Sequence, residues 1–93
     1  MPVVRSDKVS DVSILNAAIR AELESAMKLA GFASPNDYFV EYEIDRRNFY
    51  RTLRRDPQIS WIMTHTERLG VPIGEFFDRV DVRLRESAKP ETA

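Results

Sequence analysis

The sequence predicts an all-α domain built from five short helices. Apolar residues recur at spacings of three and four along most of the chain, which is the period of an amphipathic helix. Helix-start and helix-stop residues divide these stretches, among them Gly31, Ser34-Pro35, Asp45 and Gly70. No segment alternates apolar and polar residues over the length of a strand.

The chain length of 93 residues fits a single domain. We place it at residues 11–86, between a flexible N-terminus at 1–10 and a flexible tail at 87–93, because neither end carries a helical period. The chain lacks cysteine, a signal-peptide pattern and any apolar run of membrane-spanning length. We therefore expect a cytoplasmic protein without a metal, a cofactor or a membrane association.

The first helix is expected from Asp11 to Ala30. Its apolar stripe consists of Val12, Leu15, Ile19, Leu23, Met27 and Ala30. Glu24 and Lys28 are spaced to form an ion pair on this helix, and Gly31 fits the position just past its end, where a positive φ is needed.

Two further helices follow closely. Ser34 as N-cap, proline at the first position and an acid in the first turn predict a helix that ends near Tyr42. Asp45 is a good N-cap for a helix from Arg46 to Arg55. Only residues 43–45 separate the two.

The last two helices are expected at 59–69 and from Pro72 or Ile73 onward. In the former, the predicted inward residues are Ile59, Ile62, Met63 and Thr66, and Gly70 ends the helix. The latter carries Phe76, Phe77, Val80 and Leu84. Extra helical length at both ends of the domain favours dimer contact, with packing inside one chain as the alternative.

The helix at 46–55 concentrates positive charge in a chain of formal net charge −1. It holds five arginines and no acid. On a helical wheel Phe49 and Leu53 share the side that must face the core, and Arg47, Arg51 and Arg54 gather opposite them. Like charges four residues apart destabilise a helix slightly, so we expect the compensating negative charge to come from a partner.

Arginine in this role has two interpretations. Its planar guanidinium group binds phosphate or the edge of guanine through two hydrogen bonds, and Asn48 can pair with adenine. Both properties favour nucleic acid as the partner. Alternatively, the helix is an ordinary basic surface or docks on an acidic protein. Two short helices joined by about three residues, the second one basic, match the helix-turn-helix layout, in which Asn36 at the start of the first helix would lie near a phosphate.

The stretch IDRRNFYRTLRRD resembles the turn and recognition helix of Cro/repressor-like (XRE-type) helix-turn-helix proteins, closest to antitoxins and small phage or plasmid regulators. The matching positions are Ile44, Arg46, Phe49, Tyr50, Arg51 and Leu53, followed by Leu69, Gly70, Val71, Phe76 and Phe77. The resemblance covers about residues 19–78 and implies a compact five-helix lambda-repressor-like domain. The chain departs from the pattern by one extra residue between Gly31 and Ile44, by the missing glutamine at the start of the second helix, and by Glu43 in place of a turn glycine.

The resemblance implies a transcriptional regulator, expected to be a repressor, that binds double-stranded DNA as a homodimer on a palindromic operator. The residues that it places at the DNA are Asn36, Arg46, Arg47, Asn48, Tyr50, Arg51, Arg54 and Arg55. The low isoelectric point of about 5.8 keeps open a protein-interaction module, such as an antitoxin or a phage-encoded factor with a toxin or host protein as its partner.

Other residues favour structural interpretations. His65 is the only histidine, and without cysteines it is expected to be a partly buried, hydrogen-bonded core residue rather than a zinc ligand. Trp61 is expected at the edge of the core or at an interface. Carboxylate pairs such as Asp78 and Asp81 have no nucleophile or glycine-rich loop beside them, so no enzyme is expected.

Overall fold

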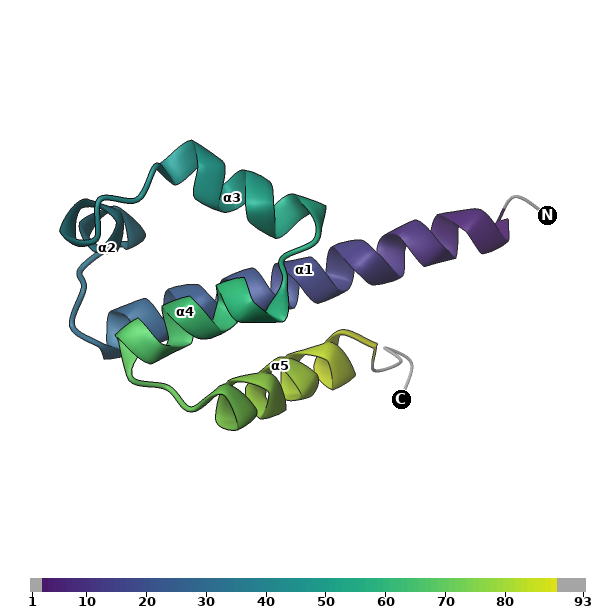
Figure 1. The fold of residues 1–93 in the computed structure, drawn as a ribbon. Coiled ribbons are helices and arrows are strands. Elements are labelled where there is room, and N and C mark those ends of the chain that lie inside the picture. Colours follow the sequence, from purple (N-terminus) through teal and green to yellow (C-terminus); the bar gives the residue numbers. More distant parts are fainter. Residues whose placement is uncertain (1–2, 89–93) are drawn as a thin grey trace.

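The computed structural model describes residues 3–88, and it describes side chains from residue 13 to residue 86. This part of the chain is all-helical, with five helices and no strand (Figure 1). The helices are α1 (Val3–Leu29), α2 (Pro35–Glu41), α3 (Arg46–Arg55), α4 (Ile59–Leu69) and α5 (Ile73–Ala88). The five predicted helices are thus confirmed in number and order.

The first helix is longer than predicted. It begins at Val3 rather than at Asp11, so it covers most of the segment 1–10, for which no helix was expected. No proline or glycine interrupts the sequence between Val3 and Ala30, so no helix-breaking residue separates the expected start at Asp11 from the observed start at Val3. At the other end α5 runs to Ala88, two residues past the predicted boundary, and residues 89–93 of the predicted tail lie outside the described residues.

Three helices end in the same hydrogen-bonded motif. After α1, the amides of Gly31 and Phe32 donate to the carbonyls of Lys28 and Met27; the corresponding pairs follow α2, at Glu43 and Ile44, and α4, at Gly70 and Val71. This is the Schellman arrangement, in which the residue past the helix end adopts a positive φ. Gly31 (105°) and Gly70 (78°) were predicted for this position, whereas α2 uses Glu43 at 53°.

The helix starts differ in how well they are capped. The carboxylate of Asp45 accepts a hydrogen bond from the Arg47 amide at 3.3 Å, which confirms the predicted cap of α3. Ser34 occupies the N-cap position of α2, but its side chain makes no capping bond. Pro35 fits this start because its fixed φ suits the first turn and its missing N–H has no helical partner to lose.

The core lies where α1 packs against the other four helices. The buried apolar side chains are Ala18, Ile19, Leu23, Ala26, Met27, Tyr38, Phe39, Phe49, Leu53, Ile62, Leu69, Phe76 and Val80. Four predicted core positions are wrong, because their side chains are exposed: Leu15, Ala30, Ile59 and Met63. The side chain of Val12, the first residue of the predicted stripe, lies outside the described residues.

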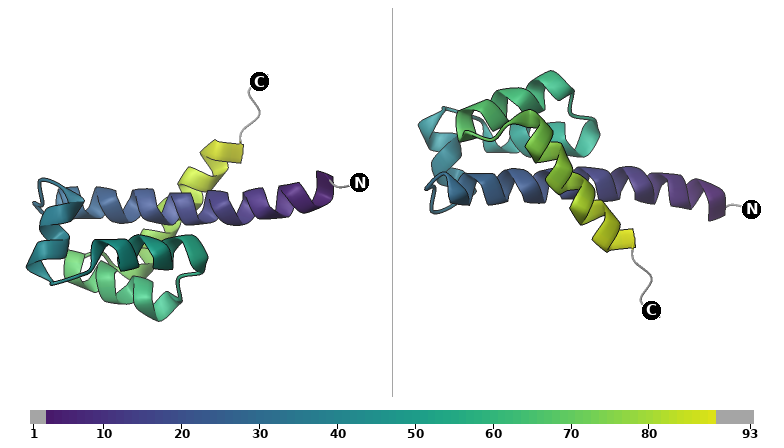
Figure 2. Two further views of the ribbon diagram at one scale, coloured as in Figure 1. Left: turned by 90° about the horizontal axis from the view of Figure 1, so that it is seen from above. Right: turned by 90° about the horizontal axis from the view of Figure 1, so that it is seen from below.

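Figures 1 and 2 show that the N-terminal part of α1 extends beyond the other helices, while the rest of it packs among them. α3 and α5 lie on opposite faces of the molecule, at the top and bottom of Figure 1. None of the described helices is long and apolar enough to cross a membrane.

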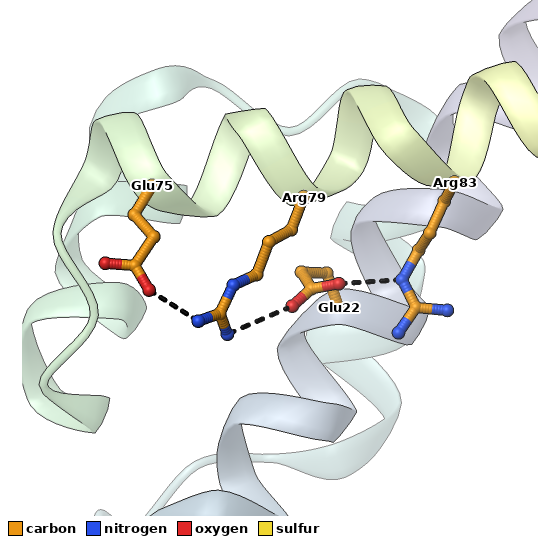
Figure 3. Close-up of polar contacts among 4 residues, drawn as sticks. All are labelled: Glu22, Glu75, Arg79 and Arg83. Atoms are coloured by element: carbon orange, nitrogen blue, oxygen red, sulfur yellow. Dashed lines mark hydrogen bonds and ion pairs between the residues drawn. The ribbon is translucent and has the colours of Figure 1, made fainter.

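An ion-pair cluster joins α1 to α5 (Figure 3). Glu22 is only 4% exposed, and its carboxylate accepts a hydrogen bond of 2.7 Å from Arg83 and lies 3.8 Å from Arg79, which also pairs with Glu75. The sequence predicted a different pair, between Glu24 and Lys28. Glu24 instead pairs with Arg20 at 3.5 Å, because Tyr50 of α3 holds its carboxylate on that side of α1.

Candidate nucleic-acid interface

The candidate interface is built on α3, which Phe49 and Leu53 fix to the core. Both side chains are 2% exposed. The ring of Phe49 lies between aromatic residues of the two neighbouring helices, 4.8 Å from Phe39 and 5.1 Å from Trp61, measured between ring centroids. Such tilted aromatic contacts restrict rotation of the helix about its own axis, so the side that faces solvent is defined.

The solvent side of α3 carries the arginines. Arg46, Arg47, Asn48, Arg51, Arg54 and Arg55 are all exposed. Within the part of the chain that the structure describes, none of these guanidinium groups forms an ion pair with a carboxylate. The wheel-based prediction of an apolar side and a cationic side is therefore confirmed, and the cationic side has an unmatched positive charge.

The arginines form two rows along α3. Arg47, Arg51 and Arg55 follow one another at four-residue intervals, and Arg51 lies almost opposite to Phe49 and Leu53 on the helix. Arg51 and Arg55 of this outer row face away from the protein, whereas Arg47 also borders the cleft between α3 and α1.

The second row consists of Arg46, Tyr50 and Arg54, and it faces α1. Together with Arg47, these residues line a cleft of about 780 Å³ between the two helices. α1 contributes Arg20 and Glu24 to the cleft, and Pro35 at the start of α2 borders one end of it.

Tyr50 lies partly buried in this cleft rather than on the outer row. Its hydroxyl donates a hydrogen bond of 2.8 Å to Glu24, and the guanidinium groups of Arg20 and Arg46 lie 5.5 Å and 5.8 Å from its ring centroid. Burial and the adjacent carboxylate raise the pKa of Tyr50 to about 12. The hydroxyl therefore stays protonated and engaged with α1, and it is not free to contact a base.

Asn36 is exposed in the first turn of α2. Its neighbour Pro35 borders the same cleft as Arg46 and Arg47, so the start of α2 and the start of α3 lie on one side of the molecule. The predicted residues are thus divided between the outer row, the cleft and the start of α2, and Asn48 is exposed on α3 outside both rows.

His65 lies in the interior, and Trp61 is half-buried at the edge of the core, as the sequence indicated for Trp61. His65 is 4% exposed and shares a hydrogen bond of 2.6 Å with the Tyr38 hydroxyl, and its ring centroid lies 4.5 Å from that of Trp61. Burial lowers the pKa of His65 to about 4, and the charge of Arg68 acts in the same direction. No group of His, Asp or Glu side chains among the described residues has the arrangement of a metal site.

Arg20 and Glu24 are site residues that the sequence analysis missed. They precede α3 by more than twenty residues, and no local pattern marks which side of α1 the arginine helix covers. No family model matches the chain, and no curated protein or solved structure proved similar to it.

Proposed function

We propose that the protein is a sequence-specific DNA-binding regulator of transcription, with α3 as the helix that enters the major groove. The observation that carries this proposal is the outer row of exposed arginines, which no described carboxylate neutralises. Positive charge held on one rigid helix face complements the phosphate-lined groove of a duplex.

The order and spacing of the helices support a lambda-repressor-like helix-turn-helix domain. α2 and α3 are separated by residues 42–45, and their aromatic side chains meet, with the Phe39 and Phe49 rings 4.8 Å apart. The resemblance of residues 44–56 to XRE-type recognition helices points the same way. In this layout α2 crosses the DNA backbone while α3 reads base edges.

Five of the six exposed residues of α3 then have a proposed role. Arg51, which faces directly outward, and Arg47 beside it are placed to bind the O6 and N7 atoms of guanine. Asn48 is suited to adenine, and Arg54 and Arg55 at the end of the helix are suited to phosphates.

We further propose that a homodimer binds a palindromic operator and represses by excluding polymerase from the promoter. Two-fold symmetry would place the half-sites about 34–36 Å apart, one turn of the duplex. The part of α1 that extends beyond the other helices offers a surface for the second copy.

Selection from a random duplex pool tests the proposal directly. Enrichment of one palindromic motif is the expected outcome, and Arg51→Ala should weaken binding to that motif by about 1–3 kcal/mol. Arg85→Ala is the matched control, because Arg85 is an exposed arginine of α5, on the opposite face of the molecule. A pool that yields no motif, or equal binding by both variants, would contradict the proposal.

A protein-interaction module, such as an antitoxin, is the second candidate. Val40 and Tyr42 leave apolar and aromatic surface exposed beside α2, and Arg68 lies 4.8 Å from the Tyr42 ring. Such a patch suits a protein partner better than a phosphate backbone. Co-purification of one partner that Val40→Asp abolishes, together with weak DNA binding, would favour this alternative.

A further inference from the structure

The cleft beside α3 continues as a groove along the boundary between α1 and α3. A second depression of about 280 Å³ adjoins the first and shares Arg20, Tyr50 and Arg54 with it. It extends the groove towards the exposed Ser13, while the amide of Asn16 donates a hydrogen bond of 3.5 Å to the Arg54 carbonyl. The result is an elongated depression rather than a closed pocket.

The groove carries more positive than negative charge. Arg20, Arg46, Arg47 and Arg54 line it, against the carboxylates of Glu24 and Asp45. Both carboxylates are engaged locally, since Asp45 caps α3, and Glu24 accepts the Tyr50 hydroxyl and pairs with Arg20 at 3.5 Å. The three arginines of α3 in the groove have no carboxylate partner among the described residues, so their charge remains available to a ligand.

Tyr50 fixes the positions of guanidinium groups from two helices. Its ring contacts both Arg20 of α1 and Arg46 of α3, and its hydroxyl is held by Glu24. Arginines that are already ordered lose less conformational entropy when they bind an anion. Tyr50 is therefore a positioning residue, and the anion would contact the arginines.

We propose that this groove binds the sugar–phosphate backbone of one strand of duplex DNA, and that α1 thereby contributes Arg20 to the interface. An extended polyanion matches the length of the groove and its several arginines better than a single phosphate does. The inference rests on the proposed function, since it assumes a duplex positioned by the outer row of α3. It predicts that loss of the Arg20 charge lowers the affinity for DNA and that loss of the Glu24 charge raises it.

Fluorescence anisotropy of the full chain tests the groove, with a labelled duplex that carries the motif selected from the random pool. Arg20→Ala is expected to weaken binding about threefold to tenfold and to reduce the log–log salt slope by about 0.9, the value for one lost phosphate contact. Glu24→Gln is expected to strengthen binding about threefold, because it removes a negative charge from beside the backbone. Ser13→Asp, at the far end of the groove, should weaken binding. Circular dichroism verifies that each variant is folded.

The comparison variants distinguish a failure of the groove inference from a failure of the proposed function. Arg85→Ala should bind as the wild type does, and Arg51→Ala should bind more weakly. If Arg51→Ala weakens binding while the Arg20, Glu24 and Ser13 variants all match Arg85→Ala, the groove inference is wrong and the proposed function stands. If the wild type does not bind the duplex, or if Arg51→Ala is without effect, the proposed function itself fails.

Discussion

Glu43 is the described non-glycine residue that adopts a positive φ, at 53°. A side chain in this left-handed region costs about 1–2 kcal/mol, and glycine avoids that cost. Glycine also adds conformational freedom to the unfolded chain, which offsets about 0.4–1 kcal/mol of the gain. We therefore expect Glu43→Gly to raise the free energy of unfolding by about 0.5–1 kcal/mol in urea denaturation.

Glu41→Gly provides the matched control for Glu43→Gly. Glu41 is the last residue of α2 and is exposed, so the same substitution there removes a helical residue without relieving any strain. It should lower the stability by about 0.5–1 kcal/mol. Equal effects of the two substitutions would mean that the turn stores no strain.

His65 makes the stability depend on pH. Its pKa of about 4 in the folded protein lies below the ordinary value of about 6.5, so between these values the unfolded chain binds a proton that the folded chain does not. The free energy of unfolding therefore has its full value above pH 6.5. It declines as the pH falls towards 4, by about 1.4 kcal/mol per pH unit. Urea denaturation at closely spaced pH values measures this slope.

His65→Gln isolates the contribution of the histidine from that of the carboxylates. Glutamine does not titrate and retains a polar group near the Tyr38 hydroxyl, with which His65 shares its hydrogen bond. The difference in stability between wild type and variant should therefore shrink as the pH falls from 6.5 to 4. A difference that stays constant over this range would show that His65 is protonated normally in the folded protein.

At the scale of the elements, the sequence predicted the helix ends best. α3 and α4 have the predicted bounds, because Asp45 and Gly70 act through local hydrogen bonds and a local φ that their own residue types determine. The start of α1 was missed since no cap residue marks it. Local chemistry therefore predicts the end of a helix if strong capping residues mark it.

The buried side of each helix was predicted less well. Ile59 and Met63 share an exposed face of α4, although Ile62 and Thr66 of the same helix are buried as expected. A stripe at spacings of three and four is broader than the contact that one neighbouring helix makes, so its margins stay exposed. Which margin is covered depends on the neighbours, and these come from distant parts of the chain.

The ion-pair cluster between α1 and α5 gives a prediction about coupling. Arg79 and Arg83 are each about 40% exposed in their side chains, whereas Glu22 is buried. Either arginine alone can offset the Glu22 charge, so Arg79→Ala should cost less than about 1 kcal/mol. Replacing both arginines leaves a buried carboxylate unpaired, and this double variant should lose about 3 kcal/mol or more.

A double-mutant cycle measured by urea denaturation tests the coupling within this cluster. The loss in the double variant should exceed the sum of the single losses, and addition of Glu22→Gln should restore part of it by removing the buried charge. Strictly additive losses would mean that Glu22 is hydrated and that the two arginines act independently.

At the scale of the whole molecule, the cationic face was predictable and its surroundings were not. Five arginines on one helix are visible in the sequence, and Phe49 and Leu53 determine how the helix is turned. Tyr50 points towards Glu24, and Arg20 lies near the Tyr50 ring, because α1 packs beside α3. A tertiary contact of this kind leaves no periodic signal in one sequence.

The extended part of α1 gives a prediction about assembly. The buried side chains that the structure describes on α1 run from Ala18 to Met27, so deletion of residues 1–10 removes none of them. The shortened chain should stay folded, with a melting temperature within about 4 °C of the full chain, the shift that corresponds to about 1 kcal/mol or less.

The same deletion should abolish the proposed dimer. A short helical extension without tertiary contacts is only marginally stable in water, and a second copy would supply such contacts. Sedimentation equilibrium should therefore give a dimer for the full chain and a monomer for the shortened chain. Affinity for a palindromic duplex should fall, while affinity for a single half-site should not change. A shortened chain that still dimerises would place the interface elsewhere, and a monomeric full chain would refute the dimer.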